Sequence, residues 1–570
     1  MNKLTIVVGL LIATAMNDPV GATESKIVPD GYGTIEIQPY RDSSPEADLI
    51  YHILLGEIAG TRKQLEVALE YYRKAVQASE NPRIAERAVG IALFANDNTA
   101  LLEIARRWHT LDADNPKVHQ ALAIALLNNK QAEAAAVHLD KLRATADKDN
   151  QDGFTAVDAL LNQVQDKALA LRAMASLRDL HANSRYAQYY YALAALEADA
   201  HEQALEGITA ALKLDPQWEN AYLLQARVRM NKKDTDGALA GLKEAVTNLP
   251  ENRQLRLGYA RLLVNAERLD EATAEFEVLA ARDPKDAEVI YSLGLLSGEK
   301  ERYDEAVTYF TRLLELGTRN TDAFFELGRV EELRSNYDKA KDWYAQVEGD
   351  ERYLTAQVRM GVMLAKSGDL PAMNEHFVKV RQDNPQSWVP LYISQAEVLR
   401  ELKHHESAFD LLTEALERES ANQDLLYSRA LTAGNLKRFD VLEKDLRTVI
   451  DADPEHGHAL NALGYTLADQ TDRYQEALGY VERAIALLPN DAAVIDSMGW
   501  VQYRLGNYEQ SLEYLRRAYE LNQDPEIAAH LTEVLWVLGQ REEARDVFQE
   551  SMKDNPDSEF LLDVKERFGL

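Results

Sequence analysis

The chain has 570 residues, with 63 Lys or Arg against 94 Asp or Glu, so its formal net charge is −31. This acidic balance argues against nucleic acid as a partner, because phosphate binding needs a positive surface. The chain contains no cysteine, which excludes disulfides, thiol catalysis, thiolate zinc sites and the lipid-bearing cysteine of a bacterial lipoprotein.

Residues 1–22 have the three-part form of a secretory signal peptide. Lys3 precedes an apolar run over residues 4–15, and small residues precede a cleavage point after Ala22. The run is too short to span a bilayer comfortably. We therefore expect cleavage and, if a bacterium makes the chain, a periplasmic product. An uncleaved anchor and a cytosolic chain are the alternatives.

Residues 23–47 follow as a flexible arm, because their proline and glycine content is typical of a segment without a helix. Residues 48–185 are predicted to hold degenerate helical repeats. Here residues 65–75 fit the second helix of a hairpin that Pro82 ends, and Pro116 closes a later unit. Ala134 and Ala168, 34 residues apart, continue the period.

Residues 186–352 carry a regular ladder of alanines, each 34 residues after the last. An aromatic residue stands four positions after the last three rungs, and a proline stands twelve positions after the first three. Small residues let two helices cross closely, aromatics fill the space between successive hairpins, and proline stops the second helix. The rungs are Ala204, Ala238, Ala272, Ala306 and Ala340.

Residues 353–556 keep the rhythm with shifts of about one residue, through Ala408, Leu442, Ala477, Ser511 and Ala544. Residues 557–570 are predicted to form a capping helix, because a solenoid must close its last apolar face. Leu561, Leu562, Val564 and Phe568 are expected on the buried side of that helix.

The period of 34 residues with alanine, aromatic and proline at fixed places resembles the tetratricopeptide repeat (TPR) family. Ile290-x-x-Leu-Gly294 and Phe324-x-x-Leu-Gly328 also fit the first-helix pattern of that family. The resemblance implies an all-α fold, a right-handed superhelical solenoid of about 14 to 15 helical hairpins with a C-terminal capping helix.

Motifs of catalysis and metal binding are incomplete. His201-Glu202 begins like the zinc-protease helix, but Leu205 replaces its second histidine. Residues 147–158 resemble a calcium loop, but Asp152 stands where glycine is needed. His404-His405 and the pair His456 and His458 fit polar turns. We predict no enzyme activity, catalytic residue, cofactor, metal site or small-molecule substrate; a hydrolase built from carboxylates that the superhelix brings together is the alternative.

Near the C-terminus, aromatic and charged residues surround the glycine position of three successive first helices. In the TPR family this position faces the inner groove, and Trp, Tyr and Arg commonly anchor protein contacts. The alternative is that Trp500 and Trp536 pack between hairpins. The candidate partner-binding residues are Asn461, Tyr465, Asp496, Trp500, Tyr503, Arg504, His530, Glu533 and Trp536.

Residues 496–506 and 524–536 resemble the C-terminal repeats of large proteobacterial envelope TPR proteins, a group that includes the lipoprotein partner of the carboxyl-terminal processing protease. The resemblance implies a non-catalytic scaffold that binds this protease and presents cell-wall hydrolases to it. Without a lipid-bearing cysteine, membrane attachment stays open, and peripheral association with the outer membrane is one option. An assembly factor for polysaccharide export or another outer-membrane machine, and a structural spacer without a client, are the alternatives.

Overall fold

The computed structural model describes residues 44–148, 153–349 and 351–570. These residues form α-helices, a short 3-10 turn and connecting loops, with no strand among them, so the predicted all-α class is confirmed. The predicted signal peptide and residues 23–43 of the predicted arm lie outside the described residues. Within the described ranges, no helix combines the length and the apolar character needed to cross a membrane.

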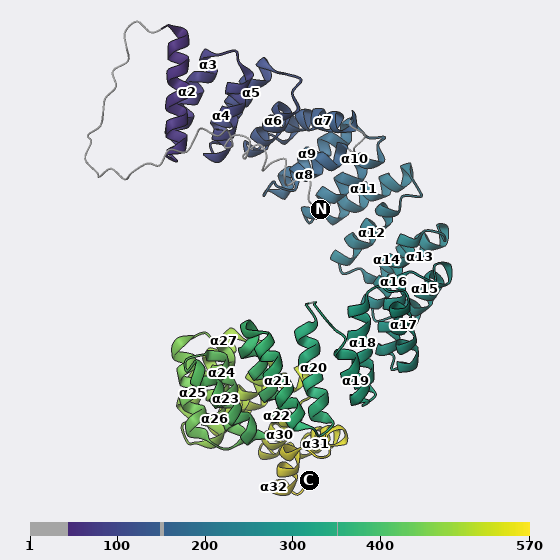
Figure 1. Ribbon diagram of the computed structural model, residues 1–570, viewed down its shortest axis with the longest axis vertical. Helices are drawn as coiled ribbons and strands as arrows, with labels where there is room; N and C mark the ends of the chain where they lie inside the picture. Colours follow the sequence, from purple (N-terminus) through teal and green to yellow (C-terminus); the bar gives the residue numbers. More distant parts are fainter. Residues whose placement is uncertain (1–43, 149–152, 350) are drawn as a thin grey trace, which may run out of the picture. The chain divides into compact units, whose positions relative to one another are not determined.

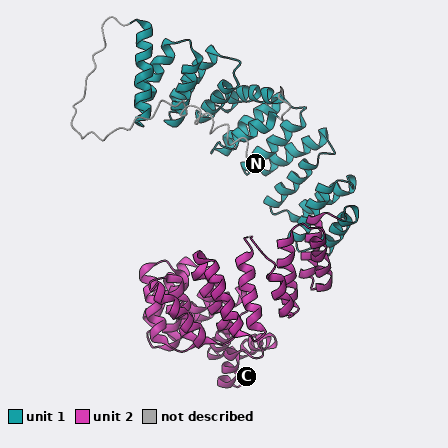
Figure 2. Ribbon diagram, viewed as in Figure 1, with its two compact units in different colours: residues 1–284 teal, residues 285–570 magenta. Residues whose placement is uncertain are grey.

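The chain divides into two compact units at Pro284 (Figure 2). Consecutive helices run antiparallel and pack side by side in the first unit (Figure 1). Its described helices are α2 (Pro45–Thr61), α3 (Leu65–Ala78), α4 (Pro82–Phe94), α5 (Asn98–Leu111), α6 (Pro116–Asn128), α7 (Ala132–Lys148), α8 (Gly153–Leu161), α9 (Lys167–Leu180), α10 (Arg185–Glu197), α11 (His201–Leu214), α12 (Glu219–Asn231), α13 (Thr235–Asn248), α14 (Arg253–Asn265) and α15 (Leu269–Arg282).

The second unit repeats the same arrangement, with a 3-10 turn, Pro385–Ser387, before α22. Its described helices are α16 (Ala287–Glu299), α17 (Tyr303–Glu315), α18 (Asn320–Leu333), α19 (Tyr337–Tyr344), α20 (Tyr353–Lys366), α21 (Leu370–Asp383), α22 (Trp388–Glu401), α23 (His405–Arg418), α24 (Gln423–Asn435), α25 (Phe439–Ala452), α26 (Gly457–Gln470), α27 (Tyr474–Leu487), α28 (Ala492–Arg504), α29 (Tyr508–Leu521), α30 (Pro525–Val537), α31 (Arg541–Asp554) and α32 (Glu559–Phe568).

In the described ranges, the thirty helices α2 to α31 pair in chain order into fifteen hairpins, and α32 follows alone. This agrees with the hairpin number expected from the repeat. The pair α8 and α9 is irregular, because α8 has nine residues and packs mainly on α7 and α10. This irregular pair lies in the part of the chain where the sequence period is degenerate.

The ladder alanines are the sites of closest approach, and all five rungs are fully buried at 0 % exposure. Opposite them, the glycine of the first helix makes room for the aromatic residue of the second. A Cβ at Gly294 would lie 2.6 Å from Cε1 of Phe310, and one at Gly328 would lie 2.6 Å from Cε1 of Tyr344. The aromatic therefore fills space inside its own hairpin as well as between hairpins.

Two details of the predicted period are wrong in the degenerate part. Ala134 and Ala168 are exposed, whereas Ala135 and Ala170 take the buried rung position. The rung follows the first residue of the second helix by three positions, and the start of that helix depends on the preceding turn. Two periods of 34 and 35 residues therefore fit the structure where a strict count of 34 does not.

Proline acts at both ends of helices. Helices α11, α13 and α15 end two residues before Pro216, Pro250 and Pro284, as predicted. Pro82 and Pro116, which we expected to close units, are instead the first residues of α4 and α6. The first helical position tolerates proline because its N–H has no partner within the helix. Pro45 likewise begins α2, inside the stretch predicted to lack a helix.

The turn inside most hairpins contains one residue with a left-handed backbone, five positions before the rung. Lys233, Glu301 and Lys437 hold it with φ of 60°, 57° and 57°, and glycine holds it at Gly506 and Gly539. A left-handed backbone costs a non-glycine residue about 1 kcal/mol or more. The repeat therefore imposes this turn even where the local residue disfavours it.

Ion pairs connect neighbouring hairpins at a regular spacing of 30 residues. Lys232 Nζ lies 2.7 Å from Glu202 Oε1, and Arg473 lies 2.9 Å from Glu443 Oε2. Each basic residue stands in the turn of one hairpin and reaches the second helix of the preceding one. These pairs are largely exposed, so each contributes little to stability, about 0 to 1 kcal/mol.

The capping helix α32 closes the last hairpin. Leu561 and Val564 are buried in one cluster with Ala528 and Phe548, and Ser558 caps the helix through Leu561 N–H. Leu562, which we expected on the buried side, is 43 % exposed. The helix has ten residues and buries only a narrow stripe, so the residue next to Leu561 turns away from the core.

We predict opposite effects for two glycine-to-alanine changes in α16. Gly294→Ala should lower the free energy of unfolding by about 1 to 3 kcal/mol, because the new methyl group overlaps the buried Phe310 ring. Gly298→Ala, four residues further on, meets nothing within 4 Å. It should raise stability by up to about 1 kcal/mol through helix propensity. Denaturant unfolding followed by circular dichroism measures both, and equal effects of the two variants would contradict this packing.

Candidate functional site

All nine candidate partner-binding residues lie on the first helices of three successive hairpins. Asn461 and Tyr465 are on α26; Asp496, Trp500, Tyr503 and Arg504 are on α28; His530, Glu533 and Trp536 are on α30. Asp491 and Asp524 cap α28 and α30 by accepting N–H groups of their first turns at 3.1 and 2.8 Å. The caps fix where each helix begins, and residues three or four apart then share one face.

The centre of this region is an ion pair between α28 and α30. Nδ1 of His530 lies 3.0 Å from both carboxylate oxygens of Asp496, and the two residues are 6 % and 5 % exposed. Burial of the ring disfavours its charged form, but the Asp496 carboxylate outweighs burial and raises the pKa of His530 above its ordinary value of 6.5. The pair is therefore a buried imidazolium and carboxylate near neutral pH.

Trp500 packs against this pair rather than facing solvent. Its ring stacks on His530 with centroids 4.1 Å apart and an interplanar angle of 19°, and it stacks on Tyr503 at 5.0 Å. Its Nε1 donates a hydrogen bond to Asp469 Oδ1 at 3.2 Å. At 7 % exposure, Trp500 takes the place expected if it packs between hairpins, and it offers little surface to a partner.

Two tyrosines donate hydrogen bonds to carboxylates on α30. The Tyr465 hydroxyl donates to Glu526 Oε1 at 2.6 Å, and the Tyr503 hydroxyl donates to Glu533 Oε1 at 2.8 Å. Burial raises the pKa of both hydroxyls, and the adjacent carboxylates add to this effect. Burial also raises the pKa of Glu526, against the hydrogen bond from Tyr465.

Buried Glu533 links this region to the capping helix. Arg567 Nη1 on α32 donates to Glu533 Oε2 at 2.9 Å, and the pKa of Arg567 is raised mainly by its hydrogen bonds to Glu533. Arg504 donates from Nη1 to the Asp469 carbonyl at 2.9 Å and from Nη2 to the Tyr474 hydroxyl at 2.8 Å. Both arginines are thus held within the chain.

Trp536 is the partly exposed aromatic of the candidate set. The exposed side chains of Arg541 and Arg545 lie over its ring, with guanidinium carbons 5.1 and 5.5 Å from the centroid. The Phe568 ring lies 5.8 Å away on the other element that flanks it, α32. Asn461 is partly buried, and its Oδ1 has no hydrogen-bond partner in the structure. We refer to Trp536, Arg541 and Arg545 as the Trp536 surface.

The sequence interpretation found the face but missed several of its members. Asp469, Glu526 and Arg567 complete the network, and each pairs with a residue 31, 61 or 34 positions away. A search for opposite charges one or two repeats apart would have found them. Three histidines on α5, α6 and α7, which no motif indicated, also lie close together and are treated below.

Of the incomplete motifs, two have structural roles. His456 caps α26, with Nδ1 accepting the Ala459 N–H at 3.1 Å. Asp147 Oδ1 accepts the N–H of Gly153 at 2.9 Å, which joins the end of α7 to the start of α8. Residues 149–152 of the calcium-like segment lie outside the described residues.

We predict that Asp496→Asn destabilises the protein more at acidic than at alkaline pH. A raised pKa of His530 means that its contribution is fully present below the unfolded value of 6.5 and is lost as the pH rises through the folded pKa. Unfolding at about pH 6 should cost the variant on the order of 3 kcal/mol, as expected for a broken buried pair. The loss should shrink by about pH 9.

Denaturant unfolding at the two pH values provides the measurement, with exposed Asp557→Asn as the matched control. A loss of stability that stays the same at both pH values would show that His530 is not charged in the folded state.

Comparison with protein families gives several matches to the tetratricopeptide repeat. Three models with that description match residues 50–82; residues 230–294; and residues 291–352, 427–492 and 497–559. The matched ranges fall on the hairpins described above, and the last includes Trp500, His530 and Trp536.

Among curated proteins, a TPR repeat-containing protein of Pseudomonas aeruginosa is 37 % identical over 516 residues, which cover 90 % of this chain and 85 % of the relative. The human cell division cycle protein 16 homolog is 32 % identical over 65 residues, 11 % of this chain and 10 % of the relative. Among solved structures, the APC/C hetero-tetramer Cut9-Hcn1 matches with a TM-score of 0.34 and 14 % identity, covering 91 % of this chain and 96 % of that chain. The extensive match to the Pseudomonas protein, together with the repeat models on the described hairpins, shows that this chain belongs to the tetratricopeptide-repeat family.

Proposed function

We propose that this protein is a periplasmic adaptor that brings an envelope protease of the carboxyl-terminal processing class together with its cell-wall hydrolase substrates. TPR proteins mediate protein–protein interactions, and no enzyme family is indicated by the comparisons. The periplasmic location rests on the signal-like residues 1–22. The protease partner rests on the resemblance carried by residues 496–506 and 524–536.

The observation that carries the proposal is that these two segments form one connected surface base. Residues 496–506 lie on α28 and its turn, and residues 524–536 lie on α30. The Asp496–His530 pair, the Trp500–His530 stack and the Tyr503–Glu533 hydrogen bond join them. A network with this much buried polar contact fixes the spacing of the two helices, and a fixed base is what a protein-binding surface needs.

We assign the protease to the Trp536 surface. Trp and Arg are the residues that most often dominate binding energy in protein interfaces. Trp536 is held by Phe568 on one side, and its two arginines are exposed. A carboxylate-bearing segment of the partner would find an aromatic face and two cations there.

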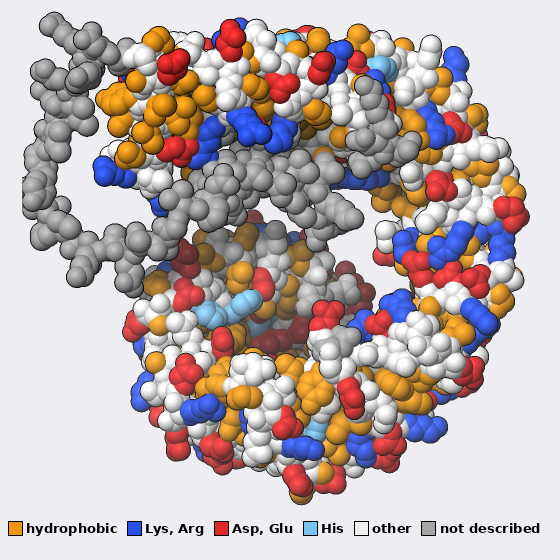
Figure 3. Space-filling model, turned by 45° about the horizontal axis from the view of Figure 1, so that its top comes forward, with side chains coloured by type: hydrophobic (Ala, Val, Ile, Leu, Met, Phe, Trp, Pro, Cys, Tyr) orange, Lys and Arg blue, Asp and Glu red, His pale blue; other side chains and the backbone are white. Residues whose placement is uncertain are grey.

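We assign the hydrolase to the outer face of α2, the first described helix. Ile50, Leu54 and Ile58, each four residues after the last, are 57 %, 55 % and 47 % exposed. Figure 3 shows hydrophobic side chains gathered at the end of the first unit where α2 lies. Exposed apolar residues in a row on one helix are typical of an interaction face.

The mechanism under this proposal is proximity. Binding two proteins to one chain makes their encounter intramolecular and raises the effective concentration of the substrate at the protease. The adaptor contributes no chemistry of its own to the cleavage. Each partner must then depend on a different surface, which can be tested separately.

We predict that the two surfaces can be inactivated one at a time. In capture from envelope extract, Trp536→Ala with Arg541→Glu should lose the protease, with affinity reduced by about 30-fold or more, as expected when a hot-spot residue is truncated. Leu54→Glu should lose the hydrolases and keep the protease, because a charge on an exposed apolar face opposes docking without disturbing the core.

Lys553→Glu, exposed near the end of α31, is the control that changes charge without touching Trp536. Capture of polysaccharide-export or outer-membrane assembly proteins by the unchanged chain would replace the proposed partners. Recovery of no envelope protein, or loss of both partners in each variant, would contradict the two-surface adaptor.

A further inference from the structure

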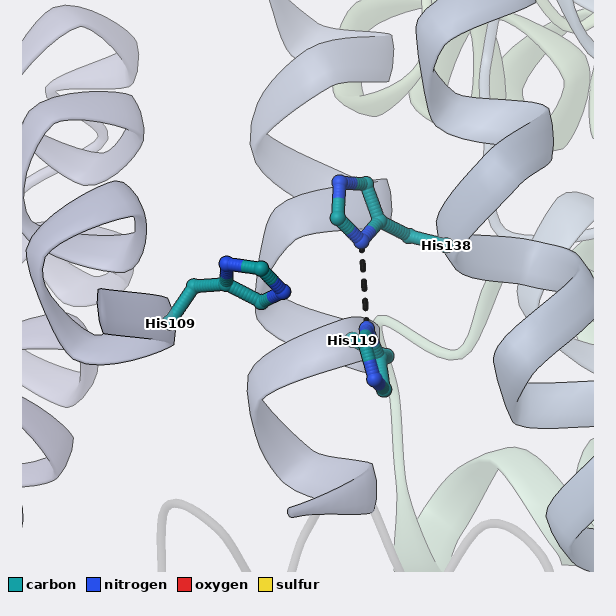
Figure 4. Close-up of side chains that lie close together, drawn as sticks. All are labelled: His109, His119 and His138. Carbon is teal, nitrogen blue, oxygen red and sulfur yellow. Dashed lines mark hydrogen bonds between the residues drawn. The ribbon is translucent and has the colours of Figure 1, made fainter. Parts of the chain in front are cut away.

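Three histidines from consecutive helices of the first unit converge on one point. His109 is near the end of α5, His119 is in the first turns of α6, and His138 is in α7. Figure 4 shows the ring of His109 directed from its own helix toward the facing rings of the other two. The turn of residues 112–115 brings the end of α5 next to the start of α6, and the antiparallel return of α7 adds the third ring.

The ring nitrogens are close enough for a shared ligand. Nδ1 of His119 lies 3.1 Å from Nδ1 of His138, and one nitrogen from each of the three rings lies within 4.8 Å of the others. Ring centroids are 5.4 to 5.6 Å apart. With metal–nitrogen bonds of about 2.0 to 2.1 Å, a tetrahedral ion needs ligand nitrogens about 3.3 Å apart. One pair already meets this spacing, and a small rotation of the His109 ring would close the other two.

The backbone holds these side chains in place. Each histidine follows or precedes a residue that is almost fully buried in the core: Trp108, Val118 and Leu139. His119 is itself buried, and the other two rings are partly buried. A ligand set on packed helices is positioned before the ion arrives, which reduces the conformational cost of binding.

The electrostatic setting favours neutral rings. Burial lowers the pKa of His138 to about 4, and the neighbouring His119 and His109 lower it further. Burial also lowers the pKa of His119, with contributions from His109 and Lys141 and opposing effects of Ala113 and Asp114. Neutral imidazole is the form that binds a metal ion, because its lone pair is free.

We propose that His109, His119 and His138 form a binding site for a divalent transition-metal ion, with Zn²⁺ as the ion that best matches three imidazoles. Imidazole nitrogens suit Zn²⁺, Cu²⁺ and Ni²⁺, and three protein ligands leave one coordination position for water or for a group from a partner. The ion would replace the proton that His119 and His138 share in their hydrogen bond. It would also join the hairpin of α4 and α5 to the hairpin of α6 and α7 in the degenerate part of the solenoid. This site is independent of the adaptor function.

The test is titration of the full chain, purified without a histidine tag and treated with a chelator, with Zn²⁺ in a calorimeter. The chain should bind one ion per molecule at this site. His109→Gln and His138→Gln should each weaken that binding by at least about tenfold, since losing a ligand costs more than losing its supporting hydrogen bond. Co²⁺ should give the visible absorption of a low-coordinate nitrogen site in the unchanged chain, and the two variants should lose it.

The double change His404→Gln and His405→Gln, at adjacent histidines of the second unit, is the matched control and should leave both readouts unchanged. Because His109 is partly exposed, His109→Gln should keep the circular dichroism spectrum of the unchanged chain, which separates loss of the ligand from loss of the fold. Absence of binding, or binding that His109→Gln and His138→Gln leave unaltered, would overturn the proposal.

Discussion

The close crossing of two helices is the constraint on which every hairpin of this protein depends. Where the helices approach, the second helix needs a residue no larger than alanine or a well-placed leucine, and the first helix needs glycine when an aromatic ring stands opposite. Gly294 with Phe310 and Gly328 with Tyr344 show the match atom by atom. Because each hairpin buries its apolar surface only on its neighbours, the same solution must recur along the chain.

The last three hairpins add a second kind of contact. Between α28 and α30 the central partners are a charged pair and stacked aromatic rings, where most other hairpins meet through aliphatic side chains. A buried ion pair adds little net stability, but removing one member leaves a charge without compensation. Such a contact tolerates only one spacing and orientation of the helices. It provides a rigid base for Trp536, the exposed member of the set.

Much of the fold could be predicted from the sequence, because burial of the rungs is encoded locally. The alanines of the regular ladder, the prolines after α11, α13 and α15, and the capping helix all follow from residue type and spacing. The register of Ala134 and Ala168 could not be predicted, because a helix start can move by one residue with its turn. Leu562 shows the same limit at a helix only ten residues long.

The sites were harder to predict than the fold. Residue type indicated that Trp500, His530 and Glu533 are unusual, but it could not distinguish a side chain that binds a partner from one that packs on the next hairpin. Burial separates the two, and burial depends on neighbours one or two repeats away, such as Asp469 and Glu526. The histidines at 109, 119 and 138 have unequal spacings, so no linear motif brings them together; only the packing of three helices does.

The exposed ion pairs between neighbouring hairpins have a mechanical consequence. Pairs such as Lys232 with Glu202 and Arg473 with Glu443 connect the turn of one hairpin to the flank of the preceding one, across the joint about which the two would bend. Salt screens exposed charges over about 10 Å or less at ordinary ionic strength, whereas the apolar contacts of the rungs are insensitive to this screening. The local bending stiffness of the solenoid is therefore tunable by ionic strength, while each hairpin stays intact.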